Sequence, residues 1–211
     1  MSAAVKPRRK PIQSRAWMTS NAIQDAFVLL LIERGYEKVT MRAIATVAGV
    51  GLGTLYEYFP GKASIAAVTV RRWMRKQAAL LAEAVSAAQG SPLVFTLRSL
   101  VQAHVGGLLS QATEWRALMY LERHISSPSS YREIYREFVS LFREAMTAAS
   151  DWPPALDAQR HANHIFSIVD AITHQVLLIQ THGPDAAEVA ADIENAVLGY
   201  WQMARTMRIE P

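Results

Sequence analysis

Apolar and polar residues recur at helical spacing through the first third of the chain. The first such pattern runs from Ser20 to Arg34, and its apolar positions fall on one helix face. These positions are Ile23, Ala26, Phe27, Leu30 and Leu31. Gly35 follows directly, and glycine readily ends a helix in a left-handed conformation. The pattern therefore predicts a helix that ends at Gly35.

Two shorter helical patterns come next. Thr40 stands where its hydroxyl can accept a hydrogen bond from the first turn of a helix over 41–48. Gly49 permits the positive φ of a sharp turn, after which 51–57 forms a second short helix. The residues expected to face the core are Ile44, Val47, Ala48 and Leu55. Two short helices joined by a tight turn are how a helix-turn-helix places a helix in the major groove of DNA.

The rest of the chain contains six further helical patterns, separated by segments that combine Pro with Gly, Ser or Asp. The predicted helices lie at about 62–88, 93–110, 114–125, 129–149, 155–181 and 185–208. No stretch alternates as a strand does, so the chain is expected to be all-α. Nothing interrupts the segment 62–88, and this helix is expected to link two domains.

The last two predicted helices carry long apolar stripes. We expect these stripes to form a dimer interface, a four-helix bundle made by two helices from each subunit. The residues assigned to it are Ile172, Val176, Ile179, Val189, Ile193, Val197 and Tyr200. Packing of the same faces within one subunit remains an open alternative.

The middle helices supply apolar and aromatic residues with a few polar groups, a mixture that is typical of ligand sites. The residues assigned to a ligand pocket are His104, Leu108, Trp115, Met119, Glu122, Phe138, Phe142, His164, Phe166 and Asp170. Aromatic residues and methionines at helical spacing also form ordinary cores, and for each of these residues that alternative remains open.

Charge is unevenly distributed along the chain. Residues 1–76 carry 13 Lys and Arg against 4 Asp and Glu, whereas residues 77–211 carry 9 against 14. A basic head on an acidic body favours a polyanionic partner for the head. Arg8, Arg9 and Lys10 belong to a basic, proline-containing arm over 1–18, which we expect to be disordered without DNA.

Other classes of function find little support. The chain has no cysteine, which excludes disulfides and thiolate chemistry, and a reducing cytoplasm fits. No uncharged apolar stretch has the length of a membrane span. Asp170 and His174 share a helix face, as do His161 and His164, but the two pairs point in different directions, and a metal needs converging ligands. Because no phosphate loop or nucleophile motif is present, we expect no catalytic residues, no metal and no cofactor.

The strongest signal is the string T-x-x-x-I-A-x-x-A-G-V-x-x-G-T-L-Y-x-Y-F-x-x-K over Thr40 to Lys62. It resembles the tetracycline-repressor (TetR) family of bacterial transcriptional regulators. Gly51 stands where that family often has Ser or Thr, and Ala43 stands where it often has an acidic residue. Both departures weaken the local helix caps slightly.

The resemblance implies an all-helical homodimer with an N-terminal helix-turn-helix domain and a C-terminal ligand-binding and dimerisation domain. We place these domains at 19–62 and 63–211. The residues expected to contact double-stranded DNA are Arg8, Arg9, Lys10, Thr40, Arg42, Leu52, Gly53, Thr54, Tyr56, Tyr58 and Lys62. Lys62 is assigned to a phosphate, and Arg42 and the outer face of the recognition helix to bases.

The sequence therefore predicts a DNA-binding transcriptional regulator. We expect a cytoplasmic repressor that a small, mainly apolar effector releases from a palindromic operator. Two other classes remain open. One is a DNA-binding adaptor whose body binds a protein partner, and the other is an enzyme that carries a helical DNA-binding head.

Overall fold

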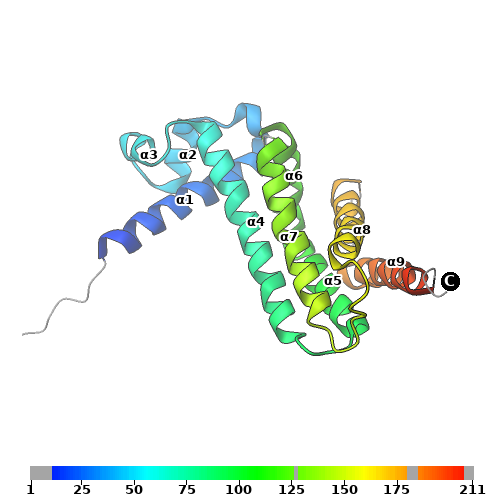
Figure 1. The fold of residues 1–211 in the computed structure, drawn as a ribbon. Helices are drawn as coiled ribbons and strands as arrows, with labels where there is room; N and C mark the ends of the chain where they lie inside the picture. Colours follow the sequence, from blue (N-terminus) through cyan, green and yellow to red (C-terminus); the bar gives the residue numbers. More distant parts are fainter. Residues whose placement is uncertain (1–10, 126–127, 180–184, 207–211) are drawn as a thin grey trace, which may run out of the picture. The chain divides into compact units, whose positions relative to one another are not determined.

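The computed structural model describes residues 11–125, 128–179 and 185–206. These residues form helices joined by turns, with no strand among them (Figure 1). The prediction of an all-α fold is confirmed. Contacts between residues divide the chain into two compact units, Met1–Thr69 and Val70–Pro211.

The first unit is built around a small core of fully buried side chains. Its elements are α1 (Pro11–Arg34), the short 3-10 helix η1 (Tyr36–Lys38), α2 (Met41–Ala48), α3 (Leu52–Tyr58) and the start of α4 (Lys62–Ala87). The core residues Ile23, Phe27, Leu30, Ile44, Leu55 and Ile65 are at most 1% exposed. Burial of each such side chain stabilises the fold by about 1.5–3 kcal/mol. The core holds α2 and α3 against α1.

Helix α1 begins nine residues before the predicted helix, at Pro11 instead of Ser20. The expectation of a disordered arm is therefore wrong for residues 11–18. Proline suits the first position of a helix, because its missing N–H has no intrahelical partner there and its φ is already helical. Arg8, Arg9 and Lys10 lie outside the described residues.

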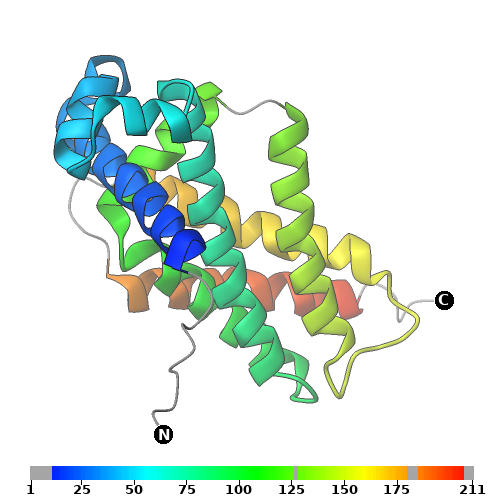
Figure 2. The ribbon, with the colours of Figure 1, turned by 90° about the vertical axis from the view of Figure 1, so that its left-hand side faces the viewer.

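The second unit contains the rest of α4 and five further helices. They are α5 (Leu93–Leu109), α6 (Ala112–Ile125), α7 (Pro128–Thr147), α8 (Ala158–Ile179) and α9 (Ala186–Thr206). All begin within three residues of their predicted positions. Helix α8 packs against α7 and α9, and α5 also packs against α9. Figure 2 shows α8 and α9 side by side in this unit.

The apolar stripe of α9 faces inward. Val189, Ile193 and Val197 are at most 7% exposed and belong to the core of the second unit. Their assignment to a dimer interface is wrong, because α5 and α8 of the same chain already cover that face. Ile172 and Val176 of α8 are only partly buried against the core.

Helix α8 is also long and apolar enough to cross a membrane by length and composition alone. Core helices of soluble proteins pass the same test. Helix α8 contributes buried residues such as Ile165 and Val169 to the core described above.

Candidate functional site

The turn between α2 and α3 has the geometry that the sequence predicts. Thr40 caps α2, and its Oγ1 accepts a hydrogen bond from the Ala43 N–H at 3.2 Å. Gly49 is left-handed, with φ 67° and ψ 30°. The Val50 N–H then donates to the Ala45 carbonyl at 3.0 Å, which completes a Schellman motif. This turn ends α2 and directs the chain into α3.

Helix α3 presents one face outward. Leu55 is fully buried, whereas Leu52 is 36% and Tyr56 is 51% exposed. Gly53 and Thr54 are also exposed, and Tyr58 is half-buried. The residues assigned to base contacts on α3 thus lie on its solvent side. The expectation that Val47 of α2 faces inward is wrong, because it is 48% exposed.

Two side chains assigned to DNA contacts differ in whether the protein itself already binds them. Arg42 is exposed near the start of α2. Lys62, at the start of α4, instead donates from its Nζ to the Tyr36 carbonyl at 2.7 Å and the Glu37 carbonyl at 3.4 Å. The same Nζ lies 4.2 Å from the centre of the Tyr36 ring. These contacts tie η1 to α4, and no pattern in the sequence predicted η1.

The second unit contains a cavity of about 980 Å³ between α6, α7 and α8, with Met74 of α4 on its wall. Five of the predicted ligand residues line it, namely Met119, Glu122, Phe138, Phe166 and Asp170. Arg123, Arg132, Tyr131, Tyr135 and His174 are among the lining residues that the prediction missed. The spacing of Asp170 and His174 was the signal that pointed to His174.

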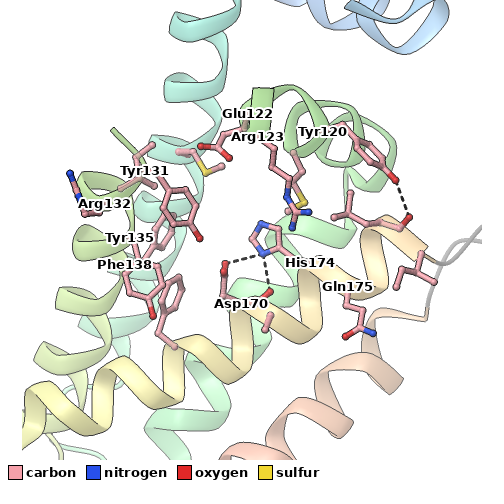
Figure 3. A pocket seen from close by; sticks show the side chains of 17 residues that line it. Tyr120, Glu122, Arg123, Tyr131, Arg132, Tyr135, Phe138, Asp170, His174 and Gln175 are labelled. Carbon is pink, nitrogen blue, oxygen red and sulfur yellow. Dashed lines mark hydrogen bonds and ion pairs between the residues drawn. The ribbon is translucent and has the colours of Figure 1, made fainter. Parts of the chain in front are cut away.

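Asp170 and His174 form an ion pair on the α8 wall of the cavity (Figure 3). His174 Nδ1 lies 3.0 Å from Asp170 Oδ1 and 2.8 Å from the Asp170 carbonyl oxygen. Burial alone lowers the pKa of His174, but the hydrogen bonds and charge of Asp170 outweigh it and raise this pKa above its ordinary value. No group of three metal-ligating side chains occurs in the described part of the chain.

Glu122 brings a second carboxylate to the cavity. Its side chain lies on α6 and the residue is 7% exposed. Its Oε1 has no hydrogen-bond partner among the described residues. Burial, followed by the negative charges of Asp170 and Glu122, raises the pKa of the Tyr131 hydroxyl. Two carboxylates, those of Glu122 and Asp170, therefore line the cavity.

Four predicted ligand residues belong to the packed core instead of the cavity wall. They are His104, Leu108, Trp115 and Phe142, each at most 3% exposed. Trp115 packs edge-on against Trp73, and Phe142 packs on Phe166. Sequence periodicity does not distinguish a cavity wall from the layer behind it, because both are apolar at helical spacing.

His104 lies directly behind the cavity wall. Its ring packs edge-on against Phe138 and Phe166 at 6.2 Å and 5.9 Å between ring centres. Neither ring nitrogen has a hydrogen-bond partner within the described residues. Burial, opposed in part by Asp170, lowers the pKa of His104 to about 4. At neutral pH the imidazole is therefore uncharged.

His164, the remaining predicted ligand residue, lies elsewhere on α8. Its Nδ1 is 2.9 Å from the Tyr200 hydroxyl, and His161 Nδ1 is 2.8 Å from the same oxygen. Tyr200, which was assigned to the dimer interface, thus connects α9 to α8. Ile179, assigned to the same interface, is 66% exposed and lines the cavity.

Comparison with known proteins places these features in a family. The sequence model described as "Bacterial regulatory proteins, tetR family" matches residues 23–68, which span the turn and α3. The HTH-type transcriptional repressor KstR of Mycolicibacterium smegmatis is 30% identical over 178 residues, which cover 83% of each chain. KstR of Mycobacterium tuberculosis is 29% identical over 83% of this chain and 77% of its own.

Solved structures agree with this fold. The fatty acid degradation regulator FadR from Bacillus halodurans has a TM-score of 0.69 at 20% identity, covering 92% of this chain and 97% of its own. FadR from Bacillus subtilis, in complex with stearoyl-CoA, has a TM-score of 0.67 at 20% identity, covering 84% and 96%. The chain therefore belongs to the tetR family of bacterial regulatory proteins and is a DNA-binding transcriptional regulator.

Proposed function

We propose that this regulator is a cytoplasmic repressor that binds a palindromic operator as a homodimer and leaves it when a small, mainly apolar effector fills the cavity. The main observation in support of this proposal is the cavity in the second unit. Its volume of about 980 Å³ suits a drug-sized or lipid-sized ligand, and its walls combine apolar side chains with a few polar groups. The KstR relatives are named repressors, and one structural neighbour holds stearoyl-CoA.

The same observation weighs against a protein-controlled adaptor. An adaptor needs no ligand-sized cavity in its body, whereas this body has a large, partly open cavity lined by four helices. We assign DNA binding to residues 19–62 and regulation and dimerisation to residues 63–211. A ligand acts only through a difference in its affinity for the two states, so it must fit the cavity better when the protein is off the operator.

The direct test begins with the operator. Genomic fragments bound by the full chain are selected and footprinted. We expect a protected site with two-fold symmetry, because a symmetric dimer presents two identical recognition helices. Selection that enriches no fragment over bulk DNA contradicts the proposal.

Coupling of the cavity to DNA is tested without knowing the effector. Ala171 lines the cavity, so Ala171→Trp places a large apolar group inside it. We expect this variant to bind the operator more weakly, because the indole stands in for a bound ligand. Ala87→Trp, at the exposed end of α4 and outside the cavity lining, is the matched control. Equal operator affinity of Ala171→Trp and wild type contradicts a regulatory role of the cavity.

Arg42 is the residue we assign to base reading. From Leu52 to Tyr58, α3 offers no Arg, Lys, Asn or Gln, so an exposed arginine from α2 is the remaining candidate for a guanine. We expect Arg42→Ala to relax preference at one base pair per half-site, at a cost of about 1–3 kcal/mol there. Binding is measured on a set of single-substitution operators. A uniform loss on every operator instead identifies Arg42 as a phosphate contact.

A further inference from the structure

The cavity wall contains a carboxylate that the protein leaves unused. Glu122 is 7% exposed, and its Oε1 has no hydrogen-bond partner in the part of the chain that the structure describes. Its position on α6 makes it part of the cavity lining. A buried carboxylate oxygen without a partner is unfavourable, because it has lost hydration and gained no compensating bond. Such a group is a candidate for a contact with a ligand.

The surroundings of Glu122 favour a positively charged ligand group. Figure 3 shows Glu122, Tyr131, Asp170 and His174 around the same open space. The carboxylate of Asp170 is already paired with His174, which leaves Glu122 as the unpaired acid. The rings of Tyr131, Tyr135 and Phe138 also line this space, and aromatic faces attract cations.

Neither arginine that lines the cavity forms an ion pair with Glu122 within the described residues. Arg123 and Arg132 both line the cavity, but both residues are exposed. An anionic ligand head placed against Glu122 would meet a group of like charge, which repels it.

We propose that the effector is a lipophilic amine, whose protonated nitrogen pairs with Glu122 while its apolar body fills the space between α6, α7 and α8. The inference rests on the proposed function, since it names the chemical class of ligand that the regulatory cavity takes. Met119, Phe138, Phe166 and Leu178 supply the apolar walls. A charge-assisted hydrogen bond to the carboxylate fixes the orientation of the amine.

Three probes of equal chain length test the head group. Binding of decylamine, 1-decanol and decanoate to the full chain is measured by calorimetry at pH 7, below their micellar concentrations. We expect decylamine to bind at least about tenfold more tightly than 1-decanol, because only the amine forms a charge-assisted hydrogen bond with Glu122. Decanoate is expected to bind most weakly, because its head group has the same charge as Glu122. Decanol or decanoate binding as tightly as decylamine overturns the proposal, as does the absence of binding by all three.

Two variants assign the effect to Glu122. Glu122→Gln keeps the shape and removes the charge, and we expect it to weaken decylamine at least about tenfold while 1-decanol is unchanged. Glu114→Gln, on the same helix but outside the cavity lining, is expected to bind all three probes like wild type. An unchanged affinity of Glu122→Gln for decylamine, or an equal loss with Glu114→Gln, overturns the assignment.

Folding of the variant is checked independently. Because Glu122 is buried and unpaired, we expect ligand-free Glu122→Gln to melt at the same temperature as wild type or higher. A lower melting temperature shows that Glu122 has a partner within the protein and contradicts the inference. The binding of decylamine is measured without DNA, and its effect on the operator complex is measured separately. If decylamine binds through Glu122 but leaves the operator complex intact, that result contradicts the proposed function and not the assignment of Glu122.

Discussion

Lys62 stands at the position of a phosphate contact in the sequence motif. In the structure, its ammonium group instead donates hydrogen bonds to two backbone carbonyls. An ammonium group has three donors, and the carbonyls of Tyr36 and Glu37 use two of them. The Tyr36 ring adds a cation–π contact. At the scale of this residue, the observed contacts hold η1 in place at the start of α4.

This role leads to a prediction for Lys62→Ala. Each lost phosphate contact lowers the log–log salt slope of DNA binding by about one unit, whereas a lost internal contact does not. We expect Lys62→Ala to leave the slope unchanged and to destabilise the protein by about 1 kcal/mol, as for one hydrogen bond. Salt titration and thermal melting measure the two quantities. A slope that falls by about one unit with an unchanged melting temperature instead identifies Lys62 as a phosphate contact.

His104 predicts a dependence of stability on pH. Its pKa is about 4 in the folded protein and near 6.5 in an unfolded chain. Between these values the unfolded chain binds a proton that the folded protein does not. The free energy of unfolding therefore falls as pH falls from about 6.5 to about 4, by up to about 3 kcal/mol from this residue.

Replacement of the imidazole tests this contribution. His104→Leu keeps a buried side chain of similar size but does not titrate, so we expect its stability to fall less than that of wild type as the pH is lowered through this range. Denaturant unfolding at several pH values measures the difference. His174, whose pKa is raised, contributes in the opposite direction in both proteins. Parallel pH profiles of the two proteins contradict the low pKa of His104.

At the scale of elements, α4 and α5 approach each other closely at a glycine. The Gln77 side chain of α4 is buried, and its Nε2 donates to the His104 carbonyl at 3.1 Å. A Cβ on Gly107 of α5 would lie 2.9 Å from both Cδ and Nε2 of Gln77. The neighbouring Gly106 has nothing within 4 Å of an added Cβ.

The two glycines form a matched pair for substitution. Gly106→Ala is expected to stabilise the protein by about 0.5–1 kcal/mol, because alanine has the higher helix propensity and meets no neighbour. Gly107→Ala gains the same propensity but displaces Gln77 and breaks a buried hydrogen bond, which costs about 1–3 kcal/mol. We therefore expect Gly107→Ala to be the less stable variant in chemical denaturation. Equal stabilisation by both changes contradicts the close approach.

Helix ends show what local sequence leaves out. The capping of α2 by Thr40 and the turn at Gly49 follow from neighbouring residues, and both predictions are confirmed. The first turn of α5 is different, because the Leu93 N–H donates to Asp151 Oδ1 at 2.6 Å across 58 positions of the chain. No local pattern predicts a cap of this kind.

At the scale of the whole molecule, dimerisation stays a prediction whose residues have changed. Val197 is fully buried in its own subunit, so Val197→Asp tests folding instead of assembly. Gly199, also on α9, is exposed and has nothing within 4 Å of an added Cβ. We expect Gly199→Arg to remain folded but to be a monomer in light scattering, because a buried unpaired charge destabilises an interface.

Gly106→Arg, at an equally open glycine on α5, is the control and is expected to remain a dimer. The monomeric variant is also expected to lose affinity for a palindromic operator, since a single recognition helix makes half of the contacts. A wild-type protein that is monomeric at micromolar concentration, or a dimeric Gly199→Arg, contradicts the assignment of α9 to the interface.

The sequence by itself determined the helical class, the positions of the helices, the capped turn and the family. These properties depend on contacts between near neighbours, in which periodicity, capping residues and glycine conformations act locally. The motif from Thr40 to Lys62 is confirmed because its apolar positions form one small core with α1. The start of α1 escaped prediction, since Pro11 reads equally as a linker residue and as the first residue of a helix.

Only the tertiary structure decided which helix faces meet. A helical stripe identifies an apolar face but not its neighbour, so the sequence left open whether the face of Ile193 and Val197 meets a second subunit or its own. In the structure, α5 and α8 of the same chain cover that face.

For the same reason, the sequence does not distinguish residues of the cavity wall from residues of the core behind it. Phe138 and Phe142 lie one helical turn apart on α7 and are equally apolar, yet of the two only Phe138 lines the cavity. The space in front of a side chain depends on where three other helices pack, and those positions are set by contacts distant in the sequence. The chemistry of the cavity, with Glu122 unpaired and Asp170 paired, follows from that packing.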